Sequence, residues 1–394
     1  MKSSKLKMVC LSDLHFGNPR ITADQIYCNL RTYLYPELEN THLLFICGDL
    51  YDQLQTVNSK AHKYVSKFIK DLLIISANTG MQVRILHGTY SHDREQLDVL
   101  NTLQFKGSRF KVISKIDVEE LKDFRFKDNI INAILRVGYL PDNLPNMTST
   151  EVIAQLKTCM NIYSWSKLDL VIGHGSFEHI FKDTDRLPTC LYSISQFQDI
   201  LNHNPIIMGH IHSPGKYMNC YYCGSFERMT HGEEEDKGFY VFTKDINNGY
   251  GWESKFIVNK NTTPFISIEP KGVDVAEISA DYVKQVREKF PDLSKPGHVR
   301  VLHEDRDIRS QLHRLTAATF PTLFYSSKRI GEITQSNNVE MVEVDLTEFD
   351  ELNVSEANLS TLIIKYLEDN GELGDISKEN ITSKVKALIR GNAK

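Results

Sequence analysis

Five short apolar runs in the first 212 residues each end in glycine, aspartate or histidine, and this repeated pattern restricts the fold more than any other feature. Short apolar runs are typical of buried β-strands, and amphipathic stretches separate them. The stretch between the second and third runs has helical spacing and stops at Gly80, a common helix-ending residue. This alternation predicts an α/β protein with layered sheets. The expected strands are 6–13, 42–49, 81–88, 168–175 and 204–212.

Each run delivers side chains that bind metal ions well. Residues i and i+2 of a strand share a face, so Asp13 with His15, and His210 with His212, can point into one pocket. Strand ends of an α/β sheet meet at one edge, where ligand sites usually lie. Each residue alone has an ordinary structural explanation, but their common position predicts a shared site. Carboxylates and imidazoles without a thiolate favour manganese, iron or zinc. The strand-end residues are Asp13, His15, Asp49, Asp52, His92, Asp93, His174, His210 and His212.

Composition narrows the possible functions. The chain of 394 residues predicts two or three domains of ordinary globular composition. A net charge of −5 means that contact with DNA would need a local basic stripe or bound cations. Arg109, Lys111 and Lys115 either contact the phosphate backbone of DNA or simply face water. Seven scattered cysteines suit a reducing compartment, and the N-terminal apolar run is too short for a signal peptide or membrane span. A cytoplasmic protein is therefore expected.

The sequence changes character twice after the fifth run. YYCGSF, GFYVFTKD and SKFIVNK are expected as consecutive antiparallel strands that complete a domain over residues 1–265. Residues 266–348 predict a small α/β domain with helices at 280–290 and 305–318. Residues 349–394 predict a helical tail of two amphipathic helices, which either pack as a hairpin on their own domain or dock a partner. The candidate partner-binding residues are Leu359, Leu362, Tyr366, Val385 and Leu388.

The strand-end motifs occur in the order DLH, GDLYD, HGTYSHDRE, GH and GHIH. Over about residues 6–245 this order resembles the calcineurin-like metallophosphoesterases, whose pattern is DxH, GDxxD, GNH[DE], a single His and GHxH. GDLYD and YCGSFERMTHGEEEDKGFYVF, residues 222–242, resemble more narrowly the SbcD-type nuclease subunits that work with an SMC-like ABC ATPase. The chain is short for that subfamily, which suits a phage version acting in the host cytoplasm. The charged turn GEEEDKG is expected as a solvated hairpin.

The resemblance implies a four-layer αββα sandwich with a small α/β capping domain that shapes access of DNA. It also implies two divalent metal ions, most naturally Mn²⁺, about 4 Å apart. One ion would bind Asp13, His15, Asp49 and His212. Asp49 would bridge to a second ion, which would also bind His174 and His210.

The same resemblance assigns roles around the scissile phosphate. His92 would protonate the leaving group or stabilise the charged transition state, and Asp93 would orient its ring. Asp52 would either orient a ligand or make an ordinary loop contact.

The segment HGTYSHDRE, His87–Glu95, lacks the asparagine whose amide oxygen binds the second metal in the resembled pattern. Ser91 takes that position if His92 and Asp93 are aligned with the motif; alternatively, Thr89 fills it directly after the glycine. A neutral hydroxyl is a poorer ligand than a carbonyl oxygen. Because every other ligand is present, the segment predicts a rebuilt corner with a weaker second metal site.

The resemblance implies Mn²⁺-dependent hydrolysis of DNA, as an exonuclease on duplex ends and an endonuclease on single strands or hairpins. Break processing, recombination or replication would be its setting, with an SMC-like ABC ATPase as partner and a homodimer as the assembly. One rival is a phosphatase or phosphodiesterase for small phosphoesters. A second rival is a catalytically weak scaffold that binds DNA ends.

Overall fold

The computed structural model describes residues 5–103, 105–127, 129–142, 147–180, 190–201, 204–247, 251–290 and 292–330. Residues 331–348 of the predicted small α/β domain lie outside these residues. So does the predicted helical tail, with Leu359, Leu362, Tyr366, Val385 and Leu388.

Two six-stranded mixed sheets form the main part of the protein, so the prediction of an α/β protein with layered sheets is confirmed. The first sheet has the order β14(Glu253–Val258), β13(Gly238–Asp245), β1(Lys5–Leu11), β2(Leu43–Ile46), β3(Gln82–Leu86) and β4(Arg109–Ile113). The second has the order β11(Gly215–Tyr217), β12(Cys220–Tyr222), β10(Ile206–Gly209), β7(Leu170–His174), β6(Asn129–Leu140) and β5(Asp117–Phe126).

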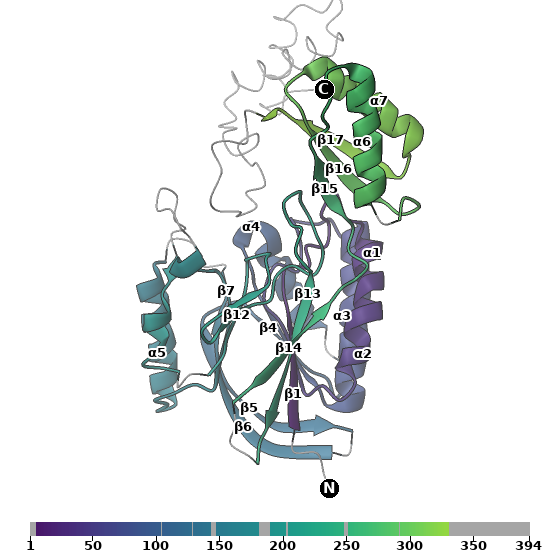
Figure 1. The fold of residues 1–394 in the computed structure, drawn as a ribbon. Coiled ribbons are helices and arrows are strands. Elements are labelled where there is room, and N and C mark those ends of the chain that lie inside the picture. The colour runs from purple at the N-terminus through teal and green to yellow at the C-terminus, as the bar shows by residue number, and fades with distance from the viewer. Residues whose placement is uncertain are drawn as a thin grey trace, which may run out of the picture. The chain divides into compact units, whose positions relative to one another are not determined.

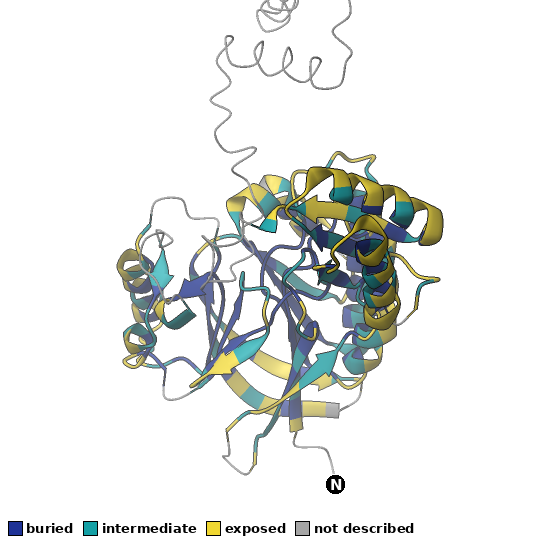
Figure 2. Cartoon of the chain, turned by 45° about the horizontal axis from the view of Figure 1, so that its top comes forward, coloured by how far each residue is buried: buried dark blue, intermediate teal, exposed yellow. Residues whose placement is uncertain are grey.

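Alternating residues of the central strands point to different cores. Met8 of β1 packs into the core between the two sheets, whereas Val9 packs against the helices outside the first sheet. The long helix α3(Lys60–Thr79) covers that outer face, and α5(Ser149–Ile162) covers the outer face of the second sheet (Figure 1). Figure 2 shows buried strands in the middle of the sheets, partly exposed strands at their edges, and exposed outer faces of the helices. The layers therefore run helix, sheet, sheet, helix.

Shorter elements connect these layers. They are α1(Ala23–Asn29), a π-helical turn (Leu30–Leu34), α2(Tyr35–Leu38), α4(Tyr90–Asp93), three 3₁₀ segments (Arg94–Thr102, Glu178–Ile180, Ile194–Phe197), and the paired strands β8(Ser176–Phe177) and β9(Leu191–Tyr192).

Local sequence determines both ends of α3. The Ser59 side chain accepts a hydrogen bond of 3.0 Å from the His62 amide and thereby satisfies one free donor of the first turn. Gly80 ends the helix with φ of 85°, a conformation that costs glycine little. The predicted stop at Gly80 is confirmed.

A three-stranded parallel sheet forms the core of the small α/β region that follows. It comprises β15(Phe265–Ile268), β16(Gly297–Leu302) and β17(Leu323–Lys328), connected by α6(Val275–Lys289) and α7(Arg306–Thr319). Asp274 and Asp305 cap the two helices by accepting backbone hydrogen bonds. Their apolar faces pack with the strands around Tyr282, which is fully buried.

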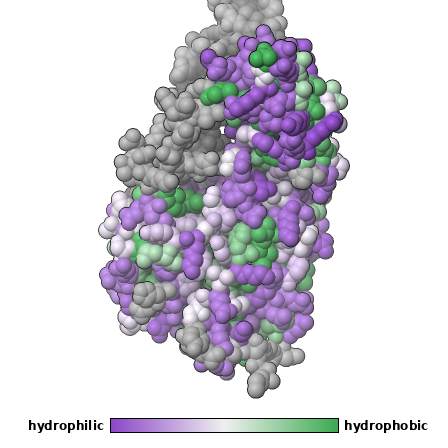
Figure 3. Space-filling model, in the orientation of Figure 1, coloured by the Kyte–Doolittle hydropathy of each residue, from purple (hydrophilic) through white to green (hydrophobic). Residues whose placement is uncertain are grey.

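The expected run of three consecutive antiparallel strands is wrong for its first member. β12 lies in the second sheet, parallel to β10, whereas β13 and β14 pair antiparallel in the first sheet. Among the described residues, no helix is both long and apolar enough to cross a membrane. The face of the molecule in Figure 3 is mainly hydrophilic over its coloured part, with only small apolar groups.

Candidate metal centre

The predicted metal ligands converge where the carboxyl ends of the central parallel strands meet. The first sheet contributes the loops after β1, β2 and β3, and the second contributes the end of β7 and the loop after β10. The candidate ligands form three overlapping groups of three residues each. Within each group, the ligand atoms all lie within 4.8 Å of one another. The groups are Asp13, His15 and His212; Asp49, His174 and His210; and His15, Asp49 and His92.

The first group has the spacing that a bound cation requires. The Nε2 atoms of His15 and His212 lie 3.2 Å apart, and His212 Nε2 lies 3.9 Å from an oxygen of Asp13. Two nitrogens at about 2.1 Å from one metal ion would be separated by about 3.0–3.4 Å. The two rings therefore fit a shared cation.

The second group is built around a buried ion pair. His174 Nε2 lies 3.3 Å from Asp49 Oδ2, and both side chains are almost fully buried. The same oxygen lies 3.8 Å from His15 Nε2, so Asp49 stands between the two groups. This position agrees with the bridging role expected for Asp49, whereas metal binding by these residues stays a prediction.

Two histidines, His174 and His212, have hydrogen-bond partners on Nδ1 that direct Nε2 towards the ligand groups, and His15 has a carboxylate near its Nδ1. His174 Nδ1 donates to the carbonyl oxygen of Cys47 at 2.7 Å. His212 Nδ1 lies 3.3 Å from Glu233 Oε1, and His15 Nδ1 lies 3.4 Å from Asp52 Oδ1. Metal-binding histidines commonly have such second partners, because these fix the tautomer and the ring orientation. Asp52 Oδ1 also accepts a hydrogen bond of 2.9 Å from Asn18, so both of its expected roles, ligand orientation and an ordinary loop contact, stay predictions.

The backbone is strained at several of the converging residues. Nine described non-glycine residues have positive φ, and four of them are Asp13 (51°), His15 (46°), Asp49 (50°) and His210 (86°). Such conformations are uncommon for non-glycine residues and cluster at functional sites. The strand ends are therefore shaped to aim these side chains rather than to continue regular structure.

Two glycines allow the loops to approach one another closely. A Cβ at Gly88 would lie 2.0 Å from Asp49 Oδ1, and one at Gly48 would lie 2.2 Å from His174 Nδ1. Gly48 also has φ of 95°. No other residue fits at either position without displacing a candidate ligand.

Charge at the second group is balanced within the protein. Burial by itself raises the pKa of Asp49, but the charge of His174 outweighs it and holds this pKa well below its usual range. Burial lowers the pKa of His174, yet Asp49 raises it to about 10. Burial, and then the charge of His174, lower the pKa of His210 to about 4. A proton on His174 therefore balances Asp49, and a divalent cation at this point would supply the same positive charge.

The segment His87–Glu95, which lacks the asparagine of the resembled motif, places a hydroxyl group at the second ligand group. Thr89 Oγ1 lies 3.3 Å from Asp49 Oδ2, 3.4 Å from His174 Nε2 and 3.5 Å from His210 Nδ1. Ser91 is exposed on α4. Of the two substitutes expected from the sequence, Thr89 is the one that reaches the group.

The expected contact between Asp93 and the His92 ring is not made among the described residues. Asp93 is fully buried, and its two oxygens accept backbone hydrogen bonds from Tyr51 at 3.0 Å and from Gly88 at 2.8 Å. The His92 ring is held instead by a hydrogen bond from Nδ1 to the carbonyl oxygen of Asp52. Asp93 therefore joins two loops, because a buried carboxylate takes the nearest backbone donors.

The turn GEEEDKG contains a buried network that sequence analysis did not find. Glu233 and Lys237 are 2% and 0% exposed and form an ion pair of 2.8 Å, so the expectation of a solvated hairpin is wrong here. Burial raises the pKa of Glu233, but His212 and Lys237 outweigh it and lower that pKa strongly. The i, i+4 spacing of opposite charges was the only signal, and surface turns share it.

Comparisons with known proteins give likenesses to solved structures alone. No protein-family model matches the chain, and no curated protein matches it. Among solved structures, the chain is similar to the one described as "GAP50 the anchor in the inner membrane complex of Plasmodium". That match has a TM-score of 0.37 and 14% sequence identity, and it covers 65% of this chain and 85% of the other.

Proposed function

We propose that this protein is a metal-dependent phosphoesterase that hydrolyses phosphodiester bonds of DNA with two divalent cations. The observation that carries the proposal is the position of Asp49, which belongs to two ligand groups, and within each group the ligand atoms lie within 4.8 Å of one another. The donor set of carboxylates and imidazoles suits Mn²⁺, iron or Zn²⁺. Two such cations, when bound, would neutralise a phosphodiester and lower the pKa of an attacking water.

His92 is the proposed proton donor. Its ring lies 4.8 Å from that of His15, at the edge of the ligand groups. The hydrogen bond from Nδ1 to the Asp52 carbonyl keeps a proton on Nδ1 and leaves Nε2 to exchange one with the leaving oxygen. Asp52 therefore holds His92 through its backbone, and its carboxylate lies 3.4 Å from His15 Nδ1.

DNA as the substrate rests on the motif resemblance, as do duplex ends, hairpins and single strands as its forms. The same resemblance supports an SMC-like ABC ATPase as partner and a homodimer as the assembly. The partner proposal has its own test. Deletion of residues 350–394 should leave cleavage intact and abolish co-purification with the ATPase, and unchanged co-purification would contradict it.

One assay separates the nuclease from its two rivals. Wild type, Asp49→Asn and His92→Ala would be incubated with Mn²⁺ and labelled hairpin DNA, duplex DNA or a small aryl phosphodiester. A nuclease cleaves the DNA, and either substitution reduces the rate by about 10²-fold or more. Cleavage of the aryl ester alone would favour a small-substrate phosphodiesterase. End binding without cleavage of any substrate would favour a scaffold.

A further inference from the structure

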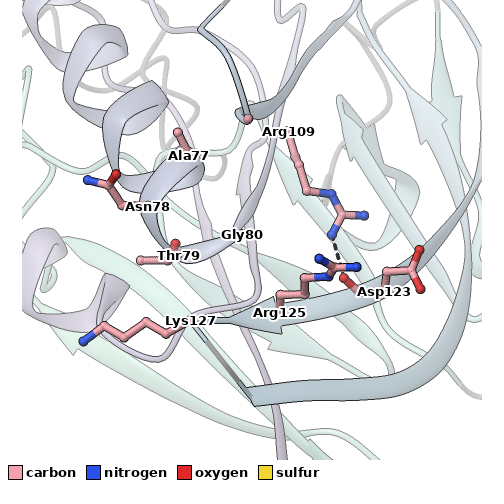
Figure 4. Close-up of a pocket in the computed structure, with 9 residues that line it drawn as sticks. Ala77, Asn78, Thr79, Gly80, Arg109, Asp123, Arg125 and Lys127 are labelled. Carbon is pink, nitrogen blue, oxygen red and sulfur yellow. Dashed lines mark hydrogen bonds between the residues drawn. The ribbon is translucent and has the colours of Figure 1, made fainter.

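A surface pocket of about 430 Å³ lies at the end of the sheets away from the candidate metal centre. Its walls are the last residues of α3, the start of β4 and the end of β5 (Figure 4). Gly80 at the pocket and Gly88 at the metal centre flank opposite ends of β3, which at about 3.3 Å per residue separates the two sites by roughly 25 Å. The pocket lining comprises Ala77, Asn78, Thr79, Gly80, Gly107, Arg109, Asp123, Arg125 and Lys127.

The lining has an excess of positive charge. It includes three cations, Arg109, Arg125 and Lys127, and one carboxylate, that of Asp123. The C-terminal end of α3 offsets only about half a charge more. Arg84 stands behind the pocket but is already neutralised by Glu119, with two contacts of 2.8 Å. A surplus of more than one positive charge therefore remains in a concave site.

Arg109 is held in place with donors to spare. Its guanidinium donates to the carbonyl oxygens of Asp123 at 2.6 Å and Lys122 at 2.8 Å, where β5 has an irregular register. Those bonds use two of the five N–H groups of an arginine. Burial lowers the pKa of Arg109, and the charges of Arg84 and Arg125 lower it further. An anion in the pocket would relieve that repulsion.

Arg125 and Lys127 complete the set from the other wall. Both are exposed, and among the described residues neither is in an ion pair. The Lys127 Nζ atom has only the Phe126 ring beneath it, 5.4 Å from the centroid. Figure 4 shows the guanidinium groups of Arg109 and Arg125 next to each other, whereas the Lys127 side chain points away from them. A tetrahedral phosphate has enough oxygens to meet both guanidinium groups, whereas a carboxylate has two oxygens in one plane, and Lys127 adds positive charge at the edge of the pocket.

We propose that this pocket binds a phosphate group and is a second anion site, separate from the metal centre. The same chemistry would accept a backbone phosphate of a nucleic-acid strand or the phosphates of a free nucleotide. No aromatic side chain lines the pocket to stack on a base, so recognition is independent of base identity.

The test measures binding in EDTA, so that bound metal cannot contribute. The probes are a short fluorescein-labelled DNA single strand, followed by anisotropy, and ATP and inorganic pyrophosphate, followed by calorimetry. The pocket variant is Arg125→Gln with Lys127→Gln, because both side chains are exposed and their loss leaves Arg109 in place. The matched control, Lys63→Gln with Lys70→Gln, removes the same charge from exposed side chains of α3 outside the pocket.

Affinity should fall roughly tenfold or more in the pocket variant and stay within about twofold of wild type in the control. Loss for the DNA strand alone identifies a nucleic-acid backbone as the ligand. Loss for ATP and pyrophosphate as well identifies a free phosphate compound. The proposal is overturned if wild type binds no probe, if the pocket variant binds as wild type does, or if the control loses as much affinity.

Discussion

The hydroxyl of Thr89 stands where the resembled metallophosphoesterase motif has an amide oxygen. The backbone of Thr89 contributes too, because its amide donates to Asp49 Oδ1 at 2.7 Å and so holds the carboxylate between the two groups. The residue directly after Gly88 thus reaches the site by position, whatever its side chain. A hydroxyl offers a metal ion weaker coordination than an amide carbonyl, so the second ion is expected to bind less tightly than the first.

Replacement of Thr89 by valine tests this role, because valine keeps the shape and removes the oxygen. Binding of the second Mn²⁺ should weaken by about tenfold, and binding of the first should change little. Isothermal titration calorimetry of the metal-free protein measures both. Ser91→Ala is the matched control and should bind both ions as wild type does. Two tight sites of equal affinity in wild type would contradict the predicted weak second site.

Glu233 provides a second prediction for a single residue. It lies 3.3 Å from His212 Nδ1 and so directs the opposite nitrogen towards His15. Glu233→Gln should lower Mn²⁺ affinity about 10–100-fold, since the ring loses a charged partner. Glu235→Gln is the control, because Glu235 contacts Lys237 but not a candidate ligand. Unfolding measured in chelator shows whether each variant is folded, and equal metal affinity in the two variants would contradict the role of Glu233.

The sequence predicted which residues converge at the candidate metal centre, but not the hydrogen-bond partners that hold the surrounding side chains in place. Asp13, His15, Asp49, His174, His210 and His212 follow apolar strands, and parallel strand ends must meet at one edge. The partner of Asp93 could not be predicted in this way, because its choice between the His92 ring and the backbone of Tyr51 depends on how two loops fold together. The spacing of residues along the chain does not show how close Asp93 comes to either partner in the folded protein.

At the scale of elements, the same limit appears in strand pairing. Apolar runs located β1, β2, β3, β7 and β10 to within a few residues. The sheet that β12 joins depends on a long-range partner, β10, which its own residues do not specify. The hairpin of β5 and β6 was not predicted, because its mixed polar and apolar pattern lacks the buried character of the central strands.

Glu227 connects distant elements and makes their packing sensitive to pH. Its Oε1 atom accepts hydrogen bonds from Asn29 in α1 at 2.6 Å and from Asn259 after β14 at 3.0 Å. Burial raises the pKa of Glu227 from 4.5 to about 7. The unfolded chain therefore releases this proton at lower pH than the folded protein. Stability from this group is complete below about pH 4.5 and is lost as pH rises to about 7.

Glu227→Gln should remove this loss, because glutamine stays neutral and can accept the same hydrogen bonds. At pH 8 the variant should be more stable than wild type by about 1–3 kcal/mol, and at pH 4 the difference should be small. Urea unfolding in chelator at both pH values provides the measurement. A difference between the proteins that does not grow from low to high pH would show that Glu227 is not the titrating group.

At the scale of the whole molecule, the candidate metal centre joins the two sheets. Asp13 and Asp49 extend from the first sheet, and His174 and His210 belong to the second. The sheets otherwise meet through the apolar core between them, which includes Phe45 and Ile207. A cation bound by residues of both sheets requires both to be in place, so metal binding and folding must be coupled.

Mn²⁺ should therefore raise the melting temperature of the intact protein. A metal concentration of about 100 times Kd stabilises a folded protein by about 2.7 kcal/mol per site, which corresponds to roughly 5 °C for a domain of this size class. Calorimetry of wild type in Mn²⁺ and in EDTA measures the shift. Asp49→Asn should lose most of it, because Asp49 belongs to two of the three ligand groups. Asp98→Asn is the control: Asp98 pairs with His87, which belongs to no group, so its Mn²⁺ response should match wild type. If Asp49→Asn responded to Mn²⁺ as strongly as wild type, the ion would have to bind elsewhere. Stabilisation by a cation that connects the two sheets would then be contradicted.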